Sequence, residues 1–305
     1  MYFPYFRGRQ YELLALRELV DCKLLGNRVI PVVEPIKIFP TFKSTMEAFT
    51  KAEQQVGLVL NPMVGELSKE PILSVTLCEL LSDPLVIPSF IVNEKMPERI
   101  REIDNSGVKR SNLLTIINKR DYLDMYSSVF GSSAPRFTLC PDERQIRRAL
   151  KHGKVLFEDK FNKQLRNADY PEDEFFSEDH LYYADEGYQG FGDYSVIGDE
   201  YSESGFAPYA VVIHIVYFSD DETLRIRHFL SDSNVDTSNV AEKFYEAVHK
   251  LAKWCQNLPP KQKTTGLGTL LRHYENQTYP GLPTLKKLSI MHHLELVGKF
   301  LTEKA

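Results

Sequence analysis

The sequence predicts an α/β protein of the (β/α)8, TIM-barrel-like class, and two observations support this prediction. Short runs rich in Val, Ile and Leu recur along the chain, and the centres of the first five lie 27 to 29 residues apart. Such runs are typical of parallel strands buried on both faces, and their spacing leaves room for a crossover helix between strands. An open doubly wound sheet is the competing fold, and it is less favoured because the chain has no glycine-rich dinucleotide motif.

Eight apolar runs are the expected strands of this barrel. In chain order they are Tyr2–Phe6, Val29–Ile36, Val56–Leu60, Leu85–Val92, Asn112–Ile117, Pro135–Cys140, Lys154–Phe157 and Tyr209–Phe218. The segments between them have apolar residues on one side of a helical pattern, which predicts crossover helices at Gln10–Leu25, Thr41–Gln55 and Asp142–Lys151. Together these units predict one domain over residues 1–305.

A long insertion is expected after the seventh strand, because the seventh and eighth runs lie much farther apart than the others. Residues 160–207 are acidic, but they contain too many aromatic side chains for a disordered linker. Beyond them, Val211–Phe218 and Thr223–Leu230 predict a hairpin. Extra helices are expected within a C-terminal segment at 236–305. These helices are Asp236–Gln256 and Pro283–Leu301.

Charge and composition exclude several classes of protein. The net charge is −5, and the stretch from Arg166 to Arg225 contains fifteen acidic residues with no Lys or Arg between its ends. Such a stretch repels nucleic acid and favours cationic partners, so direct nucleic-acid binding is not expected. No apolar run approaches the ~18 residues that span a bilayer, and no secretory signal is visible, so the expected location is the cytoplasm. The four cysteines and eight histidines lack metal-binding spacings, so no transition-metal site is expected.

Three short motifs suggest a family. They are the opening Tyr2-Phe3-Pro4-Tyr5-Phe6-Arg7-Gly8-Arg9-Gln10-Tyr11-Glu12, the segment Val29-Ile30-Pro31-Val32-Val33-Glu34-Pro35 and the later Phe191-Gly192-Asp193-Tyr194. Together they resemble the uncharacterised bacterial and phage "Beta protein" family. The resemblance implies a barrel-like fold and a place in a bacterial defence or mobile-element system, beside a partner protein encoded nearby. It implies no reaction and therefore no catalytic residue.

Polar residues directly follow the expected strands, and in a barrel the carboxyl ends of the strands surround one mouth. The catalytic candidates among them are Glu34 and Asp159, since a carboxylate with a perturbed pKa can act as a general acid or base. A buried Glu34 needs Arg7 or Lys37 as a partner, or its pKa rises. The candidates for ligand binding are Arg7, Lys37, Asn61 and Asn118. The alternative is that these groups satisfy loop backbones and pair with one another.

Two further candidates lie later in the chain. Asp193 is the third catalytic candidate, with Tyr194 beside it as a ligand-binding residue, if Asp193 points into the mouth. The alternative is a local Asx turn, which is the commoner role of Asp next to Gly. His214 is a ligand-binding candidate because its neighbours are apolar, and a buried structural histidine is the alternative.

Two functions from different classes follow from these residues. The first is a defence-system subunit that binds a basic partner protein through the acidic and aromatic insertion, since tyrosines provide contact area and carboxylates steer cations. The second is a hydrolase or lyase that acts on a small anionic substrate through Glu34, Asp159 and Asp193, with Arg7 as the counter-ion. Mg²⁺ is the metal that suits carboxylates without histidine ligands. A barrel kept only as a scaffold is a third reading.

Overall fold

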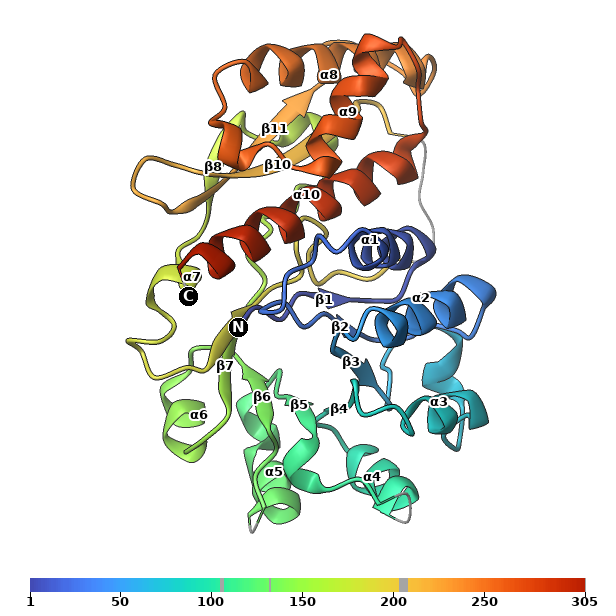
Figure 1. Ribbon diagram of the computed structural model, residues 1–305, viewed down its shortest axis with the longest axis vertical. Helices are drawn as coiled ribbons and strands as arrows, with labels where there is room; N and C mark the ends of the chain where they lie inside the picture. Colours follow the sequence, from blue (N-terminus) through green and yellow to red (C-terminus); the bar gives the residue numbers. More distant parts are fainter. Residues whose placement is uncertain (105–106, 132, 203–207, 305) are drawn as a thin grey trace.

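The computed structural model describes residues 1–104, 107–131, 133–202 and 208–304, and it shows an eight-stranded parallel sheet that forms a nearly closed barrel (Figure 1). Each strand pairs with the next strand of the sheet in parallel register. The strands are β1 (Tyr5–Phe6), β2 (Val32–Val33), β3 (Val56–Val59), β4 (Val86–Ile91), β5 (Leu114–Ile116), β6 (Phe137–Cys140), β7 (Lys154–Phe157) and β9 (Gly190–Gly192). The (β/α)8 fold class and the first seven expected strands are therefore confirmed.

Helices alternate with these strands and cover the outside of the barrel (Figure 1). The three crossover helices expected from the sequence are present, and each ends before its predicted last residue. The outer helices are α1 (Gln10–Asp21), α2 (Pro40–Lys51), α3 (Val75–Leu80), α4 (Met96–Asp104), α5 (Leu123–Phe130) and α6 (Arg144–Ala149). Short 3₁₀ helices lie between the regular elements at η1 (Glu66–Lys69), η2 (Arg110–Asn112), η3 (Arg120–Tyr122), η4 (Asn167–Asp169) and η5 (Pro260–Gln262).

The prediction of the eighth strand was wrong. Residues 209–218 belong to a different sheet, and the barrel is completed by β9, which lies inside the expected insertion. Strand β9 meets the segment before β1 through an isolated parallel bridge between Phe191 and Tyr2. The Phe3 N–H also donates to the Phe191 carbonyl at 2.8 Å. A Cβ at Gly192 would lie 2.3 Å from the Phe3 carbonyl oxygen, so only glycine allows this close approach.

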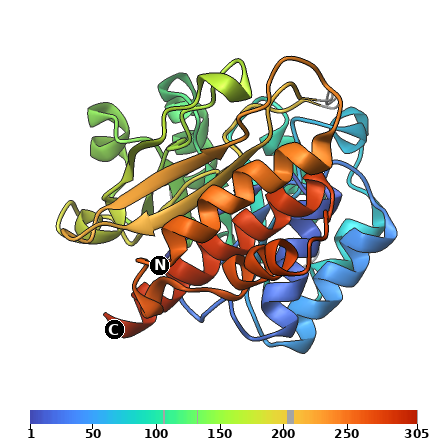
Figure 2. The same ribbon diagram turned by 90° about the horizontal axis from the view of Figure 1, so that it is seen from above.

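A second layer covers one side of the barrel (Figure 1, Figure 2). It contains an antiparallel sheet with strand order β10-β11-β8 and three helices. The hairpin and both C-terminal helices expected from the sequence are confirmed. The elements of this layer are β8 (Asp173–Ser177), β10 (Val212–Phe218), β11 (Leu224–Leu230), α8 (Val240–Cys255), α9 (Thr265–Glu275) and α10 (Leu282–Glu303). The short helix α7 (Asp179–Tyr182) follows β8 and leads to β9.

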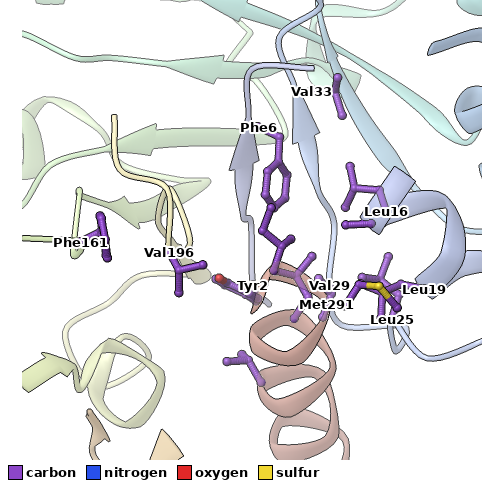
Figure 3. Packing of buried hydrophobic residues seen from close by; sticks show 14 of the residues in the cluster. Tyr2, Phe6, Leu16, Leu19, Leu25, Val29, Val33, Phe161, Val196 and Met291 are labelled. Atoms are coloured by element: carbon purple, nitrogen blue, oxygen red, sulfur yellow. The ribbon is translucent and has the colours of Figure 1, made fainter. Parts of the chain in front are cut away.

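Alternation along the strands divides the core into two parts, because successive side chains point to opposite faces. One cluster fills the barrel and includes Phe3, Tyr5 and Phe157. The other lies outside the barrel, where Tyr2 and Met291 pack between the first strand and α10 (Figure 3). A polar side chain at the end of a strand therefore faces either the mouth or this interlayer core, depending on its position in the alternation.

Side chains hold the outer edge of β10, the last strand of its sheet. The Gln262 side chain accepts from the Phe218 N–H at 2.8 Å and donates to the Phe218 carbonyl at 2.9 Å. His292 Nε2 lies 2.6 Å from the Val216 carbonyl oxygen. These contacts replace the hydrogen bonds that a further strand would make.

The helices of the described residues are all too short or too polar to cross a membrane. The end of the expected insertion at 203–207 and the last residue of the expected C-terminal segment, 305, lie outside the described residues.

Candidate functional site

Polar side chains lie at the mouth of the barrel where they come directly after a strand and are in register with its inward-pointing residues. Tyr5 points into the barrel from β1, so Arg7, two residues later, lies on the same face at the rim. The same argument places Glu34 after Val32 and Asp159 after Phe157. Three sequence-distant candidates are therefore on one side of the molecule, as the barrel geometry requires.

Glu34 is fully buried and has three donors. The Tyr5 hydroxyl donates to Glu34 Oε2 at 2.8 Å, Arg7 Nη1 donates to the same oxygen at 2.5 Å, and the Met63 N–H donates to Oε1 at 2.6 Å. Arg7, rather than Lys37, is thus the partner that a buried Glu34 needs. Glu34 is fully buried and does not line the cavity, so it is suited to hold Arg7 in place rather than to meet a ligand.

Tyr194 is the common neighbour of the rim charges. Its ring packs against Tyr5 and Phe157, with centroids 5.3 and 4.9 Å away, and the Arg7 guanidinium lies 5.6 Å from its centroid. Burial raises the pKa of Tyr194 above its ordinary value. The Arg7 charge lowers this pKa, whereas the charges of Asp199, Glu34 and Asp159 raise it. The phenol therefore stays protonated at neutral pH and can donate a hydrogen bond.

Asp159 and Arg7 hold the same residue of the loop after β9. The Asp199 N–H donates to Asp159 Oδ2 at 2.8 Å, and Arg7 Nη2 donates to the Asp199 carbonyl at 2.7 Å. The Phe161 N–H donates to Asp159 Oδ1 at 3.0 Å. Burial raises the pKa of Asp159, although both backbone N–H groups oppose this shift. Asp159 is therefore closer to neutrality than an exposed aspartate, as a general acid or base requires.

A cavity of about 580 Å³ opens beside Asp159. Its walls are residues 159–163, which follow β7, and residues 198–200, which follow β9. The volume lies in the range of small-molecule sites, ~300–1,000 Å³. The position at the carboxyl ends of barrel strands is where barrel enzymes carry their active sites.

Of the candidate residues, only Asp159 lines this cavity; Arg7, Glu34 and Tyr194 lie at the rim but are not among its lining residues. Asn61 is buried, where its amide donates to the Ile91 carbonyl at 2.7 Å and accepts from the Ile91 N–H at 2.9 Å, so it joins two strands. Asn118 is exposed. Lys37 is also exposed and lies 3.9 Å from Glu66.

Asp193 does not face the mouth, and the expectation that it joins Glu34 and Asp159 in one cavity was wrong. It follows Phe191, which points outward, so its carboxylate enters the interlayer core. There it accepts from the Tyr2 hydroxyl at 2.8 Å and from the Ser195 N–H at 2.7 Å. The second contact is the Asx turn that the sequence offered as the alternative. Burial raises the pKa of Asp193 to about 7.

His214 likewise lies away from the rim. It is on β10, in the second layer, and its Nδ1 is 2.7 Å from His228 Nδ1 on β11. Residues 209–218 belong to the second layer and not to the barrel, so His214 pairs with a histidine across two strands of that layer.

Most aromatic side chains of the insertion are at least partly buried, whereas many of its acidic side chains are exposed. Tyr170, Phe176 and Tyr188 are buried. Many of the acidic residues pair with nearby cations: Asp173 with Arg225, Glu172 with Arg227, Asp179 with Lys160, and Asp169 with Arg166. Phe175 and Tyr182 remain about half exposed, at 53% and 48%.

Within the described residues, no group of three or more His, Cys, Asp or Glu side chains could hold one metal ion. The two rim carboxylates are also engaged by protein donors. These residues therefore do not form a ready Mg²⁺ site.

Sequence reasoning missed two contributors to the site. Tyr5 lies two residues before Arg7, so the alternation of the first strand could have identified it. Asp199 contributes through its backbone, which no sequence pattern reveals.

Comparison of the chain with protein-family models, with curated proteins and with solved structures finds no match. The candidate site therefore rests on its geometry.

Proposed function

We propose that this protein is an enzyme, a hydrolase or lyase, that acts on a small anionic molecule at the barrel mouth. The observation that carries the proposal is the proximity of Tyr194 to Arg7 and Asp159, from three strand ends, with Asp159 in the wall of a cavity of about 580 Å³. Cation, acid or base, and neutral donor are the groups that such a reaction needs.

Each of the three residues has a role that its contacts support. Arg7 is the counter-ion, and its buried Nε has no acceptor among the described residues, so an anionic ligand or a water molecule would supply one. Asp159 is the general acid or base, because burial raises its pKa. Tyr194 is a neutral hydrogen-bond donor, and Glu34 is a positioning residue that orients Arg7.

The test combines ligand screening with single substitutions. Thermal shift is measured for the wild type with a panel of small carboxylates and phosphate esters, with and without Mg²⁺, and the compounds that bind are then assayed for turnover. Asp159→Asn is expected to retain binding and to lower kcat by about 10²–10⁴-fold. Arg7→Gln is expected to abolish the ligand-dependent shift.

Arg136→Gln is the matched control, because Arg136 is exposed and precedes β6 at the opposite end of the barrel. It is expected to behave like the wild type. Equal binding and turnover by wild type, Asp159→Asn and Arg7→Gln would contradict the proposal.

A second function, capture of a partner protein by the insertion, is supported by the exposed rings of Phe175 and Tyr182 and by the resemblance to the "Beta protein" family. Co-purification with the products of neighbouring genes is the test. The Phe175→Ser/Tyr182→Ser double variant is expected to lose the partner, whereas Tyr209→Ser, at a similarly exposed ring, keeps it. Capture that is unchanged in the double variant would contradict this function.

A further inference from the structure

A row of three polar side chains crosses the three-stranded sheet of the second layer. His214 on β10 and His228 on β11 are direct cross-strand neighbours, and their Nδ1 atoms are 2.7 Å apart. His228 Nε2 lies 3.1 Å from Glu174 Oε1 on β8. The row is enclosed by rings, since Tyr170 contacts both imidazoles at 4.7 and 4.8 Å between centroids.

Only one hydrogen fits between the two Nδ1 atoms. The Glu174 carboxylate is an acceptor, so His228 carries its hydrogen on Nε2, and a neutral His228 must then accept at Nδ1. His214 consequently donates from Nδ1 and has a bare Nε2. A first proton can bind at that Nε2 without disturbing the row. A second proton must bind at His228 Nδ1, where it places two N–H groups against each other and breaks the contact.

Burial is the main reason why the two histidines are neutral at neutral pH, and the nearby charges modify its effect. Burial lowers the pKa of His214 well below 6.5, and the charges of His228 and of Lys286 on α10 lower it further. Burial also lowers the pKa of His228, although Glu174 and Asp173 on β8 oppose this effect. The pair therefore takes up protons only as the pH falls below 6.5.

The row is attached to the wall of the mouth cavity. Asn162 Nδ2 donates to Glu174 Oε2 at 3.2 Å, and the Phe161 ring packs edge-on against His214 with centroids 5.0 Å apart. Both Phe161 and Asn162 line the cavity. A rearrangement of the histidine pair would thus reach Phe161 and Asn162 through direct contacts.

We propose that the His214–His228–Glu174 row is a proton-sensitive latch that holds the cavity wall at Phe161–Lys163 and releases it when the second imidazole proton binds. The latch rests on the proposed function only in assuming that the cavity binds a ligand. The evidence for the latch itself is the contact between the row and the cavity wall. It makes occupation of the mouth dependent on pH without placing a histidine in the mouth.

The experiment is an NMR titration of the full chain without any ligand, from about pH 8 down to the onset of acid unfolding. Imidazole nitrogens of His214 and His228 and backbone amides of Phe161, Asn162 and Lys163 are followed together. The amides are expected to shift with the midpoint of the imidazole step. Glu174→Gln keeps an acceptor but removes the charge that favours protonated His228. In this variant the imidazole titration and the amide shifts are expected to move to lower pH together.

His249→Gln is the matched control, because His249 on α8 bonds to the Tyr274 hydroxyl on α9, and it is expected to leave the imidazole titration and the amide shifts unchanged. Wall amides that stay fixed while the imidazoles titrate would overturn the latch. An imidazole pair that remains neutral until the protein unfolds in acid would do the same. Since no ligand is used, these outcomes are independent of whether the mouth has a substrate.

Discussion

The rim of the barrel and the interlayer core both gather buried polar side chains, but Asp159 and Asp193 differ in their access to the cavity at the rim. Asp193 in the interlayer core has its pKa raised to about 7, and the pKa of Asp159 at the rim is also raised. Asp193 is 3% exposed and bonds to Tyr2 and Ser195, whereas Asp159 lines the cavity. A carboxylate with a raised pKa therefore indicates a functional site only where a ligand can reach it.

The largest expected effect lies at the seam that joins both regions. Gly192→Ala places a Cβ 2.3 Å from the Phe3 carbonyl oxygen, so urea denaturation is expected to show a loss of about 4 kcal/mol in unfolding free energy. Gly268→Ala is the control, because a Cβ there meets open space on a helix, and a gain of about 0.5–1 kcal/mol is expected. Similar stabilities for the two variants would mean that the seam is not a tight contact.

The next largest effect is expected at the buried ion pair of the rim, Arg7 and Glu34. Arg7→Gln leaves the fully buried Glu34 without its cation, and a loss of about 3 kcal/mol is expected in denaturant unfolding. The double variant Arg7→Gln/Glu34→Gln is expected to recover part of this loss, since no unpaired charge remains. A double variant that is less stable than Arg7→Gln would show that the pair is not coupled in this way.

A third effect tests the interlayer core through pH. Burial lowers the pKa of His293 from 6.5 to about 3, so the neutral ring contributes stability that is complete above pH 6.5 and is lost as the pH falls toward about 3. Between about pH 7 and 5 this single group accounts for a loss of about 2 kcal/mol. His293→Gln is therefore expected to unfold with a weaker dependence on acid than the wild type.

The quantity to compare is the slope of unfolding free energy against pH in the wild type and in His293→Gln. Asp193 contributes a pH dependence of the opposite sign, and it does so in both proteins. Its pKa is raised from 3.8 to about 7, so its contribution is present below pH 3.8 and is lost as the pH rises through 7. His152→Gln, at an exposed histidine, is the control and is expected to keep the wild-type slope. A His293→Gln slope equal to that of the wild type would mean that His293 is not held neutral.

The smallest effect on stability is expected at the proposed reacting group. Asp159→Asn removes a partly desolvated charge and keeps an acceptor for a backbone N–H, so its unfolding free energy is expected to stay within about 1 kcal/mol of the wild type. Calorimetry provides the measurement. A loss as large as that of Arg7→Gln would assign Asp159 to structural support rather than to the site.

The sequence predicted the fold class because seven strands are apolar runs with regular spacing. The eighth could not be found in this way, since Gly190–Gly192 is short and contains two glycines that are needed where β9 approaches β1. The strongly apolar run at 209–218 was taken instead, because burial in a second sheet leaves the same pattern as burial in a barrel.

The rim was predictable only in part. The position of Glu34 and Asp159 after apolar runs placed them at the strand ends, and alternation then brings them to one face. Asp193 also follows a strand, but that strand was not recognised, so the direction of its side chain could not be derived. The pairing of His214 with His228 depends on the register of the hairpin, which a sequence of separate runs does not specify.

The side chains along β10 also bear on how this molecule meets copies of itself. An uncovered terminal strand is a template on which another polypeptide can add and start polymerisation. Here Gln262 occupies both backbone groups of Phe218, and His292 occupies the Val216 carbonyl. An incoming strand would have to displace an amide and an imidazole that are anchored in the core, so this border of the sheet resists self-association.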